Sequence, residues 1–177
     1  MRVVLLGGVI AVLVGIVGVA LQRETSRRVA PQSAPALVAV AEPAALTAEE
    51  EVYAEALWTV HSAAKVHAID LDFAGILYKT ETQDAGKLEA KVQALSGDFA
   101  AAESRARALA VPNSMRTVHE KYLGAIKLYE SAAAEMLKTA RDGDDRRLLV
   151  AQGMSQHAAE EMLRVGDVLW PAEYKPN

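Results

Sequence analysis

Apolar side chains between residues 47 and 170 recur in alternating steps of four and three residues, and this spacing restricts the folds open to the chain. It places one apolar stripe along an α-helix, whereas a half-buried strand needs an apolar residue at every second position. The stripe occurs four times, over about residues 47–82, 85–110, 113–141 and 144–170. We therefore expect four helices and no sheet.

The stripes also identify the side chains expected in the core, because only the residues on a stripe face the neighbouring helices. In the first helix they are Tyr53, Leu57, Val60, Ala64, His67, Leu71, Ala74 and Tyr78, and in the second Leu88, Val92, Leu95, Phe99, Ala102, Ala106 and Leu109. In the third they are Met115, His119, Tyr122, Ile126, Tyr129, Ala133, Met136 and Ala140, and in the fourth Leu148, Ala151, Ser155, Ala158, Met162, Val165 and Leu169.

Residues that end or cap helices stand between the stripes. Asp84 can cap the second helix, Pro112 starts the turn into the third, and Gly143 ends the third before Asp144 and Asp145. Connections this short force consecutive helices to run antiparallel. Residues 46–177 are therefore predicted to form an all-α, up-down-up-down four-helix bundle.

An uninterrupted apolar segment, residues 3–21, precedes the bundle. As a helix it would be roughly 28 Å long, close to the thickness of about 30 Å of the hydrocarbon core of a bilayer. A signal peptide cleaved after Ala20 is the alternative, but its apolar part would normally be about 7 to 15 residues long. We expect residues 1–22 to be a single transmembrane anchor.

Small residues recur along this segment at Gly7, Ala11, Gly15 and Gly18, on one face of the expected helix. Because lipid offers no hydrophobic drive for association, close backbone approach across such a face is a main source of helix packing in membranes. The face predicts contact with other membrane protein subunits. Common use of glycine and alanine in membrane segments is the alternative explanation.

Residues 23–45 read as a linker that begins with arginines and is rich in proline and alanine, with Pro31, Pro35 and Pro43 preventing a continuous helix. Counting basic residues on both sides of the anchor weakly favours a cytoplasmic bundle. The short N-terminal tail with Arg2 and the composition of the linker favour the opposite. We expect the bundle on the extracytoplasmic, periplasmic side of the cell membrane.

Charge and cysteine content exclude several classes of function. The chain has 19 Lys and Arg against 23 Asp and Glu, and four of the arginines flank the anchor, so the bundle is acidic. Nucleic-acid binding needs clustered basic residues, and nucleic acid is therefore not expected as a partner. The chain has no cysteine, which excludes disulfides, thiolate metal sites and cysteine nucleophiles.

Four-helix bundles often hold metals, but the Glu-x-x-His pattern of di-iron proteins is missing from this sequence. The remaining candidates for a metal site are His67 and His157, at similar heights on adjacent helices, with Glu160 and Glu161. The simpler interpretation is that the two histidines of the inner faces, His67 and His119, are buried and hydrogen-bond to Tyr53, Tyr122, Tyr129 or a helix carbonyl. We expect no cofactor, no metal and no catalytic residue.

The third helix carries Pro112, His119, Tyr122, Leu123, Ala125, Tyr129 and Ala132. In this pattern the chain resembles bacterial membrane-anchored four-helix-bundle proteins of unassigned function. The resemblance covers one helix and implies an anchored bundle, with no catalytic residue. Together with the sequence it predicts a non-catalytic accessory or stabilising subunit of a larger membrane complex, such as a respiratory or photosynthetic one. An extracytoplasmic sensor module that binds a ligand or a metal is the alternative.

Overall fold

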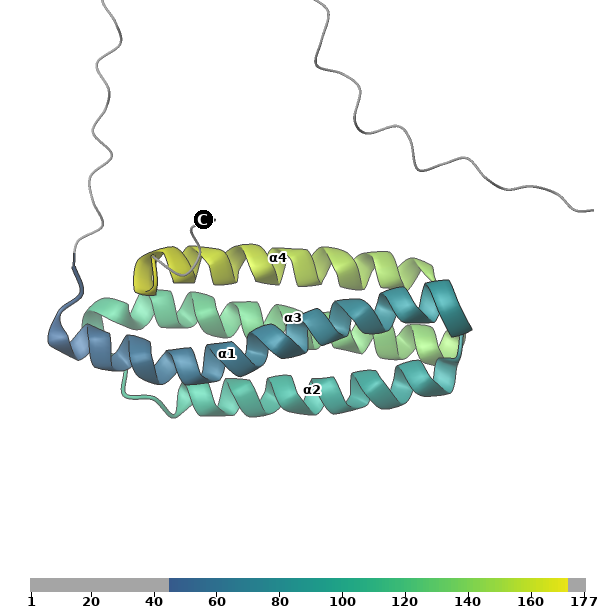
Figure 1. Cartoon of the computed structure of the whole chain (residues 1–177), viewed down its shortest axis with the longest axis horizontal. Coiled ribbons are helices and arrows are strands. Elements are labelled where there is room, and N and C mark those ends of the chain that lie inside the picture. Colours follow the sequence, from purple (N-terminus) through teal and green to yellow (C-terminus); the bar gives the residue numbers. More distant parts are fainter. Residues whose placement is uncertain (1–44, 172–177) are drawn as a thin grey trace, which may run out of the picture. The chain divides into compact units, whose positions relative to one another are not determined.

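The computed structural model describes residues 45–171, and within that range it contains four α-helices and no strand. The helices are α1 (Ala48–Leu77), α2 (Ala85–Arg107), α3 (Arg116–Asp142) and α4 (Arg146–Leu169). They run alternately in opposite directions along one axis (Figure 1), as expected for an up-down-up-down bundle. The predicted anchor, its small residues Gly7, Ala11, Gly15 and Gly18, and the linker up to residue 44 lie outside the described residues.

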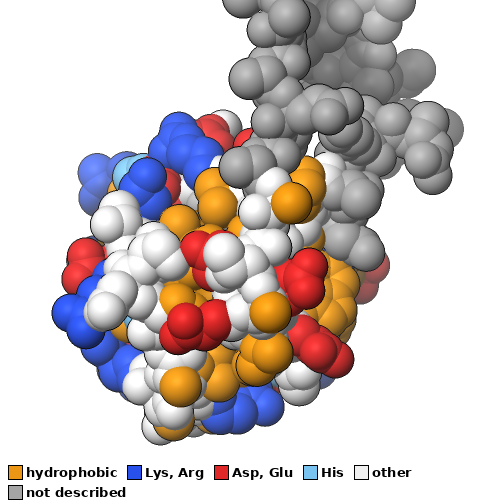
Figure 2. Space-filling model, turned by 90° about the vertical axis from the view of Figure 1, so that its left-hand side faces the viewer, with side chains coloured by type: hydrophobic (Ala, Val, Ile, Leu, Met, Phe, Trp, Pro, Cys, Tyr) orange, Lys and Arg blue, Asp and Glu red, His pale blue; other side chains and the backbone are white. Residues whose placement is uncertain are grey.

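The helix ends follow from local chemistry. Thr47 and Glu50 form a capping box at the start of α1, in which the Thr47 N–H donates to Oε2 of Glu50 at 2.8 Å. Figure 2 looks along the bundle at this end, where acidic side chains stand among hydrophobic ones; the first turn of α1 itself contributes Glu49, Glu50 and Glu51. Carboxylates here stabilise the helix because they face its positive end.

At two helix ends the sequence predicted α-helix, and the structure has a short turn of π or 3₁₀ geometry instead. α1 stops at Leu77 and continues as a π-helical turn over Tyr78–Thr82, before Asp84 caps α2 by accepting from the Lys87 N–H at 3.1 Å. A 3₁₀ turn, Asn113–Met115, precedes α3, and the Met115 N–H donates to the Pro112 carbonyl at 2.9 Å. α2 continues through Gly97 without a break, as predicted.

The predicted core positions of α2 and α4 are buried as expected, apart from the partly buried Leu109. In α3 all are buried except Ala140, which is partly buried. α1 departs from the prediction at His67, whose side chain is 26% exposed, whereas His61 is buried. Rings from other helices cover His61, since it stacks on Trp170 and meets Tyr122 edge-on. His67 lies instead on the side of α1 that faces α2, beside Asp98.

In cross-section the four helices stand at the corners of a square, and the two helices along one edge of it have few contacts with each other. α3 packs extensively against α2 and α4, and α1 packs against α2, but α1 touches α4 at few positions. α1 also crosses the bundle obliquely in Figure 1. Space between helices therefore remains along the α1/α4 edge.

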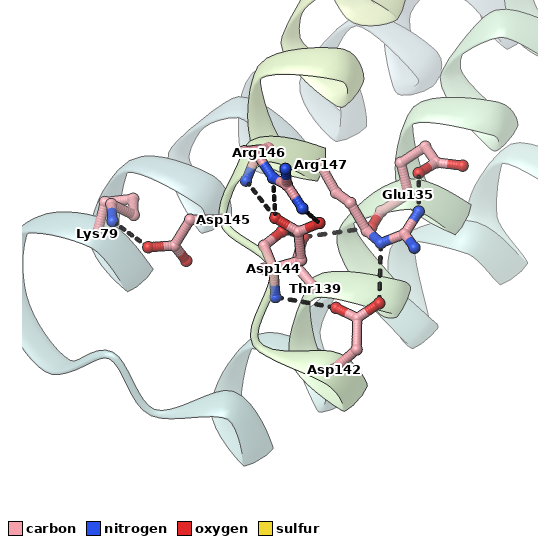
Figure 3. A network of polar contacts seen from close by, with 8 residues as sticks. All are labelled: Lys79, Glu135, Thr139, Asp142, Asp144, Asp145, Arg146 and Arg147. Atoms are coloured by element: carbon pink, nitrogen blue, oxygen red, sulfur yellow. Dashed lines mark hydrogen bonds and ion pairs between the residues drawn. The ribbon is translucent and has the colours of Figure 1, made fainter.

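Charged side chains fix the turn from α3 to α4 (Figure 3). Asp144 accepts from Nε and Nη2 of Arg146, both at 2.8 Å, and these hydrogen bonds are the main cause that lowers the pKa of Asp144 to about 2. Arg147 donates to Asp142 at 2.9 Å and to Glu135 at 3.1 Å. Lys79, from the turn after α1, also pairs with Asp145, so both neighbouring and distant residues hold the turn.

Gly143 ends α3 with φ of 72°, the left-handed conformation that glycine adopts without strain, and its N–H donates to Thr139 O. We expect Gly143→Ala to lower the free energy of unfolding by about 1 kcal/mol. Gly153 is the matched control, because it lies inside α4 with no atom within 4 Å of an added Cβ. Gly153→Ala should raise stability by up to about 1 kcal/mol, so denaturant titrations of the two variants should shift in opposite directions.

Candidate functional site: the histidine cluster and the α1/α4 groove

His61 stands at the centre of a group of aromatic rings contributed by α1, α3 and the end of α4. Its imidazole stacks on Trp170, with centroids 5.1 Å apart and planes at 24°, and meets Tyr122 edge-on at 6.0 Å. Trp58 lies 5.7 Å away on the preceding turn of α1. Trp170 is in turn held by α1, since its Nε1–H donates to the Ala54 carbonyl at 3.2 Å. The cluster therefore joins the last helix to the first.

Burial keeps this imidazole neutral. It lowers the pKa of His61 to about 4, and the positive charge of Lys65, one turn further along α1, adds to the effect. Lys65 is itself placed over the Trp58 ring, with Nζ 5.5 Å from the centroid. A neutral ring between indoles is suited to packing and hydrogen bonding near pH 7.

His119 forms a second buried contact, with Tyr53. A hydrogen bond of 3.0 Å joins Nδ1 of His119 to the Tyr53 hydroxyl, and Tyr53 is one of the partners expected for it from the sequence. Burial lowers the pKa of His119 and raises the pKa of Tyr53 to about 12. The pair ties α1 to α3 as two neutral groups.

A groove of about 240 Å³ opens along the α1/α4 edge beside His61. Small side chains create it, because Ala64 and Ala68 of α1 and Ala159 of α4 do not fill the space between the helices. Asp72 on its rim accepts from the Ser155 hydroxyl at 2.7 Å, one of the few polar contacts between α1 and α4. The remaining lining residues are His61, Lys65, Ile69, Tyr129, Met162 and Leu163.

The side chains considered as metal ligands each contact other polar side chains. His67 lies 3.5 Å from Asp98 on α2, and the exposed His157 lies 3.7 Å from Glu161 on its own helix. Glu161 also pairs with Arg164, and Glu160 accepts from Gln156 at 3.2 Å. Over residues 45–171 no group of three or more His, Asp or Glu side chains is arranged to hold a metal ion.

The outward face of α1 carries an apolar stripe that the sequence analysis missed. Its members follow one another in steps of three, four, three and one residues, and each is between 47 and 56% exposed. They are Val66, Ile69, Phe73, Ile76 and Leu77, called the outer stripe below. The same spacing rule that found the inner face predicts this one when it is applied to the other side of the helix. Ile69 also lines the groove, so stripe and groove are continuous.

No helix in the described part of the chain is both long and apolar enough to cross a membrane. Comparisons of the chain with protein-family models, with curated proteins and with solved structures found no match. The outer stripe, the groove and the His61 cluster are therefore the features from which a function has to be inferred.

Proposed function

We propose that this chain is a non-catalytic accessory subunit of a larger membrane protein complex. In this proposal residues 1–22 anchor the chain in the bilayer, and the bundle docks against other subunits on the extracytoplasmic side. The observation that carries the proposal is the outer stripe. A helix with apolar residues on its outward face as well as on its inward face is normally covered on both sides.

The exposed apolar area also argues for a protein partner over a small ligand. Five large apolar side chains lie together on one helix, and contiguous patches of this kind mark sites of association on soluble surfaces. The groove, in contrast, has about 240 Å³ and is open along the helix edge. Pockets for small molecules typically enclose roughly 300 to 1,000 Å³.

The experiment compares native particle masses of the full-length protein, extracted in mild detergent, with those of two variants. Phe73 is 54% exposed in the outer stripe, and Leu149 is 71% exposed on α4. We expect Phe73→Glu to move the protein from a large particle with stoichiometric subunits to a small one, because a charge would be buried in the contact. Leu149→Glu is the matched control and should leave the large particle intact. A wild-type protein that already runs free of other subunits would contradict the proposal.

A ligand- or metal-binding sensor is the second candidate, and the groove beside His61 is the observation that favours it. Ala159 lines the groove from α4 and is exposed. Ala159→Phe should fill the groove and abolish ligand binding if the protein is a sensor. Under the accessory-subunit proposal the same variant should keep the particle mass of the wild type.

A further inference from the structure

The outer stripe has the spacing of one strand of a two-stranded coiled coil. Val66 and Phe73 occupy one set of heptad positions and Ile69 and Ile76 the other, so the four form a seam about 15 Å long on the side of α1 away from the core. A seam of this kind is complementary to a copy of itself. Two-fold pairs of identical chains use such a patch on both partners.

We propose that the outer stripe binds a second copy of this chain, with the two α1 helices parallel. The inference rests on the proposed function, in which this face docks a protein, and it names that protein. The charges beside the seam decide the direction of pairing. Lys65 and Asp70 flank it on opposite sides, five residues apart. Lys65 is exposed, and the Asp70 side chain is 42% exposed and pairs with Lys91 of α2.

In a parallel pair, a residue on one flank meets the residue five positions later on the partner helix. Lys65 of each chain then faces Asp70 of the other, and the two-fold axis creates this attraction twice. In an antiparallel pair each flank of the seam would instead face the same flank of the partner helix, so Lys65 would no longer lie opposite Asp70 and this attraction would be lost.

Because the seam is small, pairing through it would depend on both chains being anchored in the same membrane. Stable complexes in solution bury about 1,600 Å², more than five half-exposed side chains on one helix provide. Two chains anchored in one bilayer would also be held close to each other. Tethering raises the effective concentration to about the millimolar range, where a small seam suffices for pairing.

The absence of cysteine from the chain allows a direct test in membranes containing the full-length protein. A single cysteine is introduced as Ile69→Cys, as Phe73→Cys or, as the control, as Ala101→Cys at an exposed position of α2. We expect oxidation to link two Ile69→Cys chains roughly tenfold faster, or more, than two control chains, because the seam holds the pair together. Linking only when Ile69→Cys and Phe73→Cys chains are mixed would show an antiparallel pair and overturn the proposal.

A charge exchange adds a readout for the direction of pairing. On the Ile69→Cys background, Lys65→Glu should slow the linking, since it sets like charges against each other. Adding Asp70→Lys to that variant should restore the rate. The exchange also replaces the Asp70 partner of Lys91, a surface pair that contributes about 1 kcal/mol or less to folding. Failure of the exchanged pair to restore linking would count against parallel packing.

The outcomes separate the two proposals. If Ile69→Cys links no faster than the control, while Phe73→Glu still releases the protein from a large particle, another protein occupies the stripe and the self-pairing proposal is wrong. If Ile69→Cys links fast but the wild-type protein in mild detergent runs as a pair of chains free of other subunits, self-pairing stands and the accessory-subunit proposal is wrong.

Discussion

Replacing Ile126 by aspartate is expected to unfold the bundle. Ile126 lies in the middle of α3, the helix with the most contacts in the square, and its side chain is fully buried. An aspartate there would have to bury an unpaired charge or take up a proton, and it would also lose the packing of the isoleucine. The combined cost exceeds about 4 kcal/mol, comparable to the whole stability of many domains of this size.

Far-UV circular dichroism of the purified protein measures this outcome, with loss of the helical signal as the expected result. The control is Leu149→Asp, the same kind of change at a side chain that is 71% exposed on α4, which should leave the helical signal unchanged. Leu71→Asp, at a fully buried position of α1, should behave like Ile126→Asp. A helical Ile126→Asp protein with a sharp melting transition would show that this face of α3 does not lie in the core.

Acidification is expected to remove about 3 kcal/mol of stability through His61 alone, because its pKa is about 4 in the bundle against a normal value of 6.5. In the unfolded chain the imidazole takes up a proton as the pH falls below 6.5, whereas in the fold burial prevents this until about pH 4. The unfolded state therefore binds more protons in this window. Stability from His61 is complete above pH 6.5 and is lost as the pH approaches 4.

Urea titrations between pH 7 and pH 4.5 test this expectation, since the carboxylates whose pKa values are lowered, such as Asp144, change mainly at lower pH. His61→Phe keeps an aromatic ring against Trp170 and should flatten the profile, leaving the smaller contribution of the buried His119. His157→Gln, at an exposed position of α4, should retain the wild-type profile. An unchanged slope in His61→Phe would show that His61 is not the group that responds.

The sequence was sufficient to predict the four helices, their direction and most of their inner faces, because each helix carries a regular stripe and short connections join them. The α4 positions from Leu148 to Leu169 illustrate this, since all of those predicted are buried. In α1 the seven-residue repeat selects His67, which is 26% exposed, whereas the buried histidine is His61. His61 is buried because Trp170 at the end of α4 covers it, and the spacing within α1 does not reveal that contact.

The candidate site was harder to predict for two physical reasons. The groove depends on how far α1 stands from α4, a distance that tertiary packing sets and that Ala64, Ala68 and Ala159 do not reveal in the sequence. The outer stripe, in contrast, was visible as a second apolar spacing through Val66, Ile69, Phe73 and Ile76. It was overlooked because one face of each helix was assigned to the core and the other was assumed to be solvated.

The open α1/α4 edge has a consequence for the order of events during folding. Contacts among α2, α3 and α4 join neighbouring parts of the chain, whereas the hydrogen bond from Trp170 to Ala54 closes a loop of 116 residues. Closing so long a loop carries the largest entropic cost, so the contact between α1 and α4 should form after the transition state. Substitutions at Ala159 or Met162 should then accelerate unfolding while leaving the refolding rate nearly constant, which makes this edge the determinant of the lifetime of the native state.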